Sequence, residues 1–405
     1  MNIFMKHIIL WTATLAVLLG VGLYGIFTAS ERSGVTFREV LDEALIRIPI
    51  PPSPVSLREN VVPKNVDQIA AASSTYRRVL PGMAPASNPV ESVSQCARIT
   101  KGQYDCYADY LTDVVASQGI PEAFVVLKKL YNDGDSFAIA QCHQLVHVIG
   151  RAATTQFSTV AESYNYGDIL CWSGYYHGIM EAIIAEMGIE NVPKQLNDVC
   201  SVLPSRSTYG FNYFNCVHGL GHGVMYVAAH NLFEALDLCN LLEGDWEQSS
   251  CYGGVYMENV IANEVDHISE YFRDDDVLYP CTEVDDRYKA SCYLMQTSHV
   301  LTENGYDFQD AFAVCTTADS GYENTCYQSI GRDASGSSNN IAEVTMSKCL
   351  MGHDHNAQEH CVTGAAKDFV SYYHSDTEAI VFCEALPEEH IDSCMLTVQE
   401  YYSVF

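Results

Sequence analysis

Histidine and glutamate side chains recur at helical spacing in the middle of this chain, each group close behind a cysteine. Three pairs stand four residues apart: His143 and His147, His177 and Glu181, and His218 and His222. This spacing brings two side chains onto one face of a helix, about 5–6 Å apart at Cβ, so that both can reach one ion. Glu258 and His299 follow later cysteines at comparable distances. The pattern predicts neighbouring helices that direct their ligands toward one metal site.

The donor types restrict the ion. Imidazole with carboxylate suits Zn, Fe or Cu rather than Mg or Ca. We predict one or two divalent transition-metal ions, with the ligands His143, His147, His177, Glu181, His218, His222 and His299. Glu258 is the candidate general base for a metal-bound water.

A competing interpretation is that these are core histidines, since a neutral imidazole can satisfy a backbone carbonyl between helices. Burying five or six imidazoles in one region without a metal leaves many polar groups to be satisfied. Three pairs together therefore favour the metal site.

Cysteine spacing indicates how such helices become neighbours. Most of the 16 cysteines form close couples: Cys96/Cys106, Cys200/Cys216, Cys239/Cys251, Cys281/Cys292, Cys315/Cys326, Cys349/Cys361 and Cys383/Cys394. The first members of the last four couples recur every 34 residues. A fixed period of this length is typical of stacked helical hairpins, in which each unit buries its apolar face against its neighbours. We predict that one disulfide clamps each hairpin at its turn.

By this period, by the paired cysteines and by small residues within the helices, residues 96–405 resemble disulfide-linked relatives of the tetratricopeptide class. The resemblance implies an α-α superhelix with a concave face. The predicted fold class is therefore all-α, a disulfide-clamped helical-hairpin solenoid of about eight or nine units behind an N-terminal transmembrane helix.

Two cysteines, Cys142 and Cys171, fall outside the couples, in the units that carry histidines. A bridge between them would join two adjacent repeats and hold the first two ligand pairs together. Thiolate ligation of the metal is the alternative, although an oxidising compartment favours the bridge.

Three glycines lie among the ligands in the segment His218-Gly-Leu-Gly-His-Gly223. Each costs up to about 1 kcal/mol relative to alanine inside a helix. Close helix packing explains them, and so does room for an ion beside the backbone.

An unbroken apolar stretch at residues 8–27 is long enough to span a bilayer as a helix. Lys6 before it and the cysteine-rich remainder after it favour an N-terminus inside and a C-terminal domain outside. We predict a signal-anchor at residues 1–30, a tether with a proline-rich linker at 31–95, and the repeat domain at 96–405. A cleaved signal peptide, which would give a secreted protein, is the alternative.

Composition excludes several function classes. With 51 acidic and 21 basic side chains the formal charge is −30, which repels nucleic acid and anionic lipid surfaces. Motifs for zinc proteases of the H-E-x-x-H type, for serine hydrolases and for P-loop NTPases are absent. Two classes remain: a metal-dependent enzyme outside the cytoplasm, hydrolytic or oxidative, and a surface-anchored protein- or ligand-binding scaffold with a structural ion or none.

Overall fold

The computed structural model describes residues 93, 95–99, 101–157, 159–203, 210–261 and 269–403. The chain divides into two units, Met1–Asn60 and Val61–Phe405, and all described residues belong to the second. The predicted anchor at residues 8–27 and almost all of the tether at 31–95 lie outside the described residues. Among the helices that are described, none combines the length and apolarity needed to cross a membrane.

Within these ranges the chain forms helices and no strand, which confirms the all-α prediction. The first helices are α5 (Gln103–Gln118), α6 (Ile120–Asn132), α7 (Ser136–Ala140), α8 (Cys142–Ala153), α9 (Val160–Tyr164), α10 (Leu170–Met187), α11 (Val192–Val199), α12 (Gly210–Val227) and α13 (Leu232–Cys239). The remaining helices are α14 (Asp245–Val260), α15 (Asp286–Glu303), α16 (Phe308–Cys315), α17 (Glu323–Gly336), α18 (Ala342–Cys349), α19 (His355–Tyr373), α20 (Thr377–Glu384) and α21 (Glu388–Tyr402).

A short helix followed by a long one is the repeating element. Five of the short helices, α11, α13, α16, α18 and α20, each have eight residues and have a cysteine within one residue of the C-terminal end. Several helices begin at a side chain that accepts a backbone N–H, such as Asn231 before α13 and Asp307 before α16. The sequence period therefore corresponds to one hairpin. The solenoid form of the whole array stays a prediction.

All sixteen cysteines are paired, and every predicted couple is a disulfide. The bridge between Cys142 and Cys171 is also present and joins α8 to α10. Thiolate ligation by these two cysteines is therefore not the arrangement in this structure. Eight disulfides indicate an oxidising compartment outside the cytoplasm.

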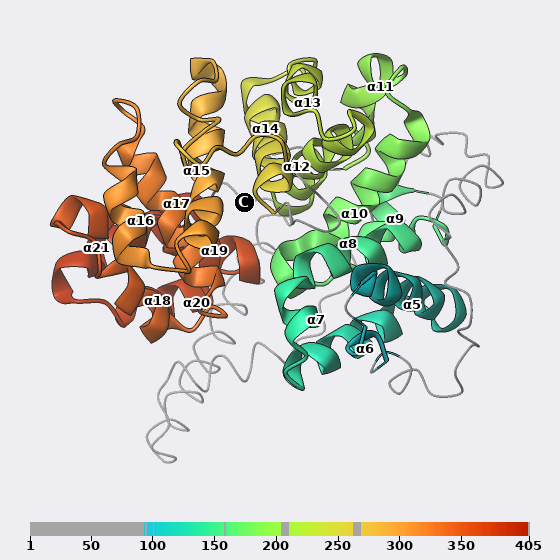
Figure 1. The fold of residues 1–405 in the computed structure, drawn as a ribbon, viewed down its shortest axis with the longest axis horizontal. Coiled ribbons are helices and arrows are strands. Elements are labelled where there is room, and N and C mark those ends of the chain that lie inside the picture. Colours follow the sequence, from blue (N-terminus) through green and yellow to red (C-terminus); the bar gives the residue numbers. More distant parts are fainter. Residues whose placement is uncertain are drawn as a thin grey trace, which may run out of the picture. The chain divides into compact units, whose positions relative to one another are not determined.

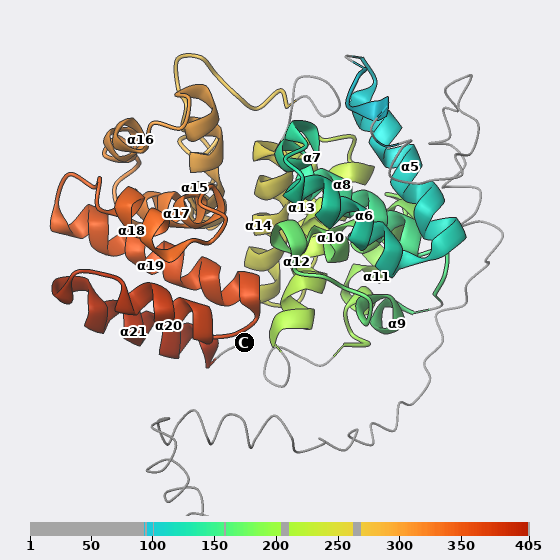
Figure 2. The ribbon, with the colours of Figure 1, turned by 90° about the horizontal axis from the view of Figure 1, so that it is seen from below.

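The long helices pack against one another in chain order. Contacts run from α8 to α10, α12, α14, α15, α17, α19 and finally α21, and Figures 1 and 2 show these helices following one another in this way. Each long helix thus has the long helices of the preceding and following hairpins as neighbours. The histidine pairs lie on three consecutive members of this series, α8, α10 and α12.

Candidate metal centre

Five histidines from three consecutive helices meet in the core. Helix α8 supplies His143 and His147, α10 supplies His177, and α12 supplies His218 and His222. His143 is partly exposed, whereas the other four have between 0% and 3% of their surface exposed. The ring centroids of His177 and His222 lie 4.4 Å apart, and those of His143 and His147 lie 4.5 Å apart. The three helices thus bring these five side chains together, as the sequence predicted, and their role as ligands stays a prediction.

Three of the rings are oriented by an oxygen atom at Nδ1. His143 Nδ1 donates to the Cys171 carbonyl at 2.8 Å, and His147 Nδ1 donates to Glu181 Oε1 at 2.5 Å. His222 Nδ1 donates to Glu258 Oε2 at 2.6 Å. Because a carbonyl or a carboxylate accepts the Nδ1 proton, the neutral form of each ring has its lone pair at Nε2. Such oxygen partners orient the imidazole and raise its basicity at metal sites in proteins.

In the two histidines of α8, the Nε2 atoms lie close together. His143 Nε2 and His147 Nε2 lie 2.9 Å apart. When both rings are neutral, their protons are at Nδ1 and the two Nε2 lone pairs face each other. Neighbouring imidazole nitrogens that share one ion at about 2.0–2.1 Å are separated by about 3 Å, so the spacing suits two ligands of a common ion.

His177 and His218 complete the cluster from the other side. His177 Nδ1 is buried and has no hydrogen-bond partner among the described residues. His218 bonds to the backbone of Ser250. Ligand atoms lie within 4.8 Å of one another in two overlapping groups, one of His143, His147 and His177, the other of His177, His218 and His222. The donor set therefore fits one or two ions.

Burial favours the neutral form of three of these imidazoles. Burial first, and neighbouring imidazoles second, hold the pKa values of His143, His177 and His218 well below the usual range for histidine. A metal ion binds the unprotonated ring, so these three histidines favour the form that an ion would require.

Glu181 is part of a buried charge pair as well as a partner of His147. Its second oxygen accepts from Arg151, and Arg151 also reaches the hydroxyl of Tyr104 at 3.3 Å. Burial opposes ionisation of Glu181, but His147 and Arg151 outweigh it and hold the pKa of this carboxyl well below its usual range. Glu181 is therefore an ionised acceptor that fixes the His147 ring.

Both carboxylates are close enough to contribute to the metal site themselves. His147, Glu181, His222 and Glu258 form a third group with ligand atoms within 4.8 Å of one another. The direct roles predicted for Glu181 as a ligand and for Glu258 as a general base stay predictions. The hydrogen bonds show a further role, which is to position His147 and His222.

His299 lies apart from these groups. It is on α15, largely buried, with its ring stacked on Phe272 at a centroid distance of 3.8 Å. None of the groups with ligand atoms within 4.8 Å includes it among the described residues. Its predicted role as a ligand is not tested, and the structure gives it a different neighbour.

Glycines allow the helices of the centre to approach closely. A Cβ atom on Gly178 of α10 would lie 2.1 Å from the His147 carbonyl oxygen, and one on Gly221 of α12 would lie 2.2 Å from the Cys251 carbonyl oxygen. Gly219 and Gly223 face the side chains of Met180 and Ile184 on α10. These contacts support close packing as the reason for the glycines.

A left-handed turn precedes the regular part of α10. Cys171, Trp172 and Ser173 have φ values of 52°, 55° and 58°, a conformation that costs about 1 kcal/mol or more for each non-glycine residue. The turn contains the disulfide partner of Cys142 and the carbonyl that accepts from His143. Strained backbone is therefore located at the edge of the histidine cluster.

Sequence reasoning missed a polar cluster beside the histidines. Arg332 on α17 donates to Asp333 Oδ1 at 2.6 Å and to Ser298 Oγ at 2.6 Å. Burial and His222 lower the pKa of His218, and the charge of Arg332 contributes to the same shift. Asp368 on α19, which is 7% exposed, belongs to this cluster.

Hydrogen bonds from Ser335 and Trp172 reach Asp368, so the turn at the start of α10 also contacts the polar cluster. Burial is the main cause that raises the pKa of Asp368 to about 7. Arg332 and Asp368 follow no cysteine or histidine spacing, so nothing in the repeat pattern indicated them.

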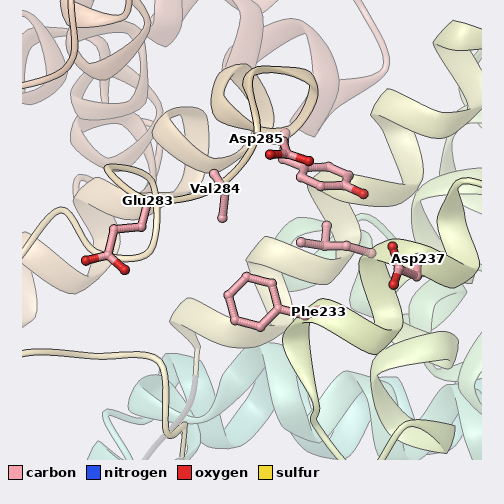
Figure 3. Close-up of a pocket in the computed structure, with 7 residues that line it drawn as sticks. Phe233, Asp237, Glu283, Val284 and Asp285 are labelled. Atoms are coloured by element: carbon pink, nitrogen blue, oxygen red, sulfur yellow. The ribbon is translucent and has the colours of Figure 1, made fainter.

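A separate pocket of about 230 Å³ contains none of these side chains. Its walls are Phe233, Leu236, Asp237, Glu283, Val284, Asp285 and Tyr288 (Figure 3). The chemistry of the histidine cluster is therefore distinct from this acidic pocket.

No protein-family model, curated protein or solved structure matches the chain. The side chains of the centre and their geometry are thus the basis for a function.

Proposed function

We propose that this protein is a transition-metal protein that acts outside the cytoplasm, anchored to the membrane through residues 8–27. The five histidines hold one or two ions of Zn, Fe or Cu. Buried histidine and glutamate groups that could hold an ion support the metal. Eight disulfides support the compartment.

One observation carries the proposal. His143 and His147 direct their Nε2 atoms at each other across 2.9 Å, while their Nδ1 protons are committed to Cys171 and Glu181. A shared proton would require an imidazolium, which burial disfavours at His143. An ion satisfies both lone pairs without adding a proton.

We favour a metal-dependent enzyme over a structural ion. A bound ion would supply Lewis-acid or redox chemistry. Glu181 and Glu258 hold the Nδ1 protons of His147 and His222, and Arg151 keeps Glu181 ionised. Disulfides already stabilise the hairpins, so an ion that only stabilised the fold would add little.

Metal content of the purified full chain tests the proposal. After removal of loosely bound ions with a chelator, we expect about one or two equivalents of Zn, Fe or Cu by elemental analysis. His147→Ala and His222→Ala should lose most of this metal, and His143→Ala, at the partly exposed ligand, provides a variant that disturbs packing least. His353→Ala, at an exposed position outside the cluster, should retain it.

A wild-type chain that folds and forms its disulfides in the presence of Zn, Fe or Cu at neutral pH and still contains no ion would refute the metal site. Circular dichroism of each variant separates loss of metal from loss of fold. Metal loss in His353→Ala equal to that in His222→Ala would contradict the assignment of the ligands.

A further inference from the structure

A second group of metal-competent side chains lies where α19 and α21 begin. His355 is the first residue of α19, and Glu389 and His390 are in the first turn of α21. These two long helices pack against each other (Figure 2). One ligand atom from each of the three residues lies within 4.8 Å of those of the other two. None of them belongs to the five-histidine centre.

His390 is the informative member of this group. Its side chain is completely buried, and its Nδ1 faces Glu359 Oε2 at 3.2 Å. Because the carboxylate accepts the Nδ1 proton, the neutral ring has its lone pair at Nε2. That Nε2 atom is buried and has no hydrogen-bond partner among the described residues. A buried polar atom of this kind is costly unless something binds to it.

The other two members lie near enough to provide that partner through an ion once their exposed side chains rotate toward it. Glu389 Oε1 lies 3.9 Å from His390 Nε2, beyond hydrogen-bonding distance but short enough for two ligands of one metal ion at about 2.0–2.2 Å. The His355 ring stacks on the His390 ring, with centroids 4.9 Å apart and planes 15° apart. His355 and Glu389 are exposed, with side-chain exposures of 64% and 67%.

We propose that His355, Glu389 and His390 form a second, surface-accessible site for a divalent transition-metal ion such as Zn²⁺ or Cu²⁺. Two imidazoles and one carboxylate suit these ions. Three protein ligands leave a position for water or for a donor from another molecule. The positive N-terminal ends of α19 and α21 oppose a cation, and the carboxylates of Asp354, Glu359 and Glu389 offset this.

The location of the ligands distinguishes this site from the buried centre. His355 and Glu389 can leave the ion without any movement of the helices, whereas the central ligands lie between packed helices. The surface site should therefore exchange its ion readily. A chelator should remove this ion first, and the site should remain in a chain that has lost the central ligand His222.

Zinc binding to the full chain, stripped with a chelator and then titrated by equilibrium dialysis, tests the site. Among the zinc ions that wild type binds, one equivalent should belong to this site. His355→Ala should lose this equivalent or bind it at least about tenfold more weakly. Glu389→Gln should weaken the same equivalent. His353→Ala is the matched control, because His353 is an exposed histidine two residues away that belongs to no group. The variants His355→Ala and Glu389→Gln alter exposed side chains, so the fold is retained.

A local measurement identifies the ion's position. Zinc should protect His355 from acylation by diethyl pyrocarbonate while leaving His353 reactive, as read by tandem mass spectrometry. The proposal would be overturned if wild type and His355→Ala bound zinc equally. It would also be overturned if His355→Ala and His353→Ala lost the same amount of bound zinc. His222→Ala should retain the zinc equivalent of the surface site, and His355→Ala should retain the metal of the centre. The experiment therefore distinguishes a wrong assignment of the central site from a wrong assignment of the surface site.

Discussion

At the scale of single residues, Glu258 illustrates how structure adds to a role predicted from spacing. Its carboxylate accepts from His222 Nδ1 at 2.6 Å and is 5% exposed. A carboxylate in this position orients the His222 ring, and it would also be close to an ion bound by that ring. Substitution can separate the two roles.

Glu258→Gln should retain the metal, because the amide oxygen can still accept from His222 Nδ1. If Glu258 is also a general base, activity should fall by about 10²–10⁴-fold at unchanged metal content. Glu258→Ala removes the acceptor and should weaken metal binding by about 10–100-fold. Metal affinity and activity measured on the same preparations check this. Unchanged affinity in Glu258→Ala would show that the carboxylate does not support the ligand.

Asp368 gives a pH dependence with a definite sign. Burial raises its pKa from 3.8 to about 7, so the folded chain holds a proton that the unfolded chain releases between about pH 4 and pH 7. The free energy of unfolding therefore falls as the pH rises through this window. The full penalty, on the order of 4 kcal/mol, is present above pH 7.

Asp368→Asn removes this titration. Between pH 5 and pH 8 wild type should lose several kcal/mol more stability than the variant, measured by urea unfolding at both pH values. Histidine titration contributes equally to both chains and cancels in the comparison. Asp392→Asn, at an exposed residue of α21, should behave like wild type. Parallel pH profiles for wild type and Asp368→Asn would contradict the assignment.

At the scale of helices, α14 contains two adjacent glycines, of which one has room for a Cβ atom and the other does not. A Cβ atom on Gly254 would lie 2.0 Å from the His218 carbonyl oxygen, whereas one on Gly253 would have its nearest neighbour, His218 Nδ1, at 3.4 Å. Gly254→Ala should force α12 and α14 apart. The free energy of unfolding should therefore fall by about 1–3 kcal/mol or more.

Gly253→Ala should be neutral or stabilising by up to about 1 kcal/mol, because alanine is the better helix former. Thermal unfolding and metal content of the two variants check this pair. Because α12 carries His218 and His222, Gly254→Ala should also lower metal affinity. Equal stability of both variants would contradict the packing argument.

The helices and the five central histidines could be predicted because their signals are local and repeated. A spacing of four residues puts His143 and His147 on the same face of one helix. A 34-residue period indicates that successive cysteine couples lie in equivalent hairpins. Other features had no such signal. The left-handed turn at Cys171 contains no glycine to mark it, and Arg332 and Asp368 reach the neighbourhood of the centre only through tertiary packing.

At the scale of the whole molecule, the disulfides differ in which helices they join. Cys142–Cys171 joins two long helices that carry central histidines, whereas Cys383–Cys394 joins α20 to α21. Removing either bridge through a double Cys→Ser change should cost about 3 kcal/mol, since the chain-entropy effect varies slowly with loop length.

Metal content should separate the two changes. Loss of Cys142–Cys171 should weaken the central metal, because His143 bonds to the Cys171 carbonyl. Loss of Cys383–Cys394 should leave it unchanged. Elemental analysis together with urea unfolding checks both effects, and equal metal loss in the two double variants would show that the first bridge has no special role.

The proposed anchor predicts where the chain is found. The full chain should remain with the membrane after washing with alkaline carbonate, because about 20 apolar residues span the bilayer. A chain without residues 1–30 but with an export signal should be released in soluble form. Recovery of a soluble mature protein that begins near Glu31 would show instead that the segment is cleaved.

Burial of His147, His177, His218 and His222 has a consequence for the timing of metal acquisition. Once α8, α10 and α12 have packed and the bridge between Cys142 and Cys171 has closed, we expect slow release of a bound ion, because four of its five proposed ligands lie between packed helices. Loading is therefore expected to accompany oxidative folding, and the ion should exchange over hours rather than seconds. A chain oxidised without metal would be kinetically trapped in an empty form that still binds metal tightly at equilibrium.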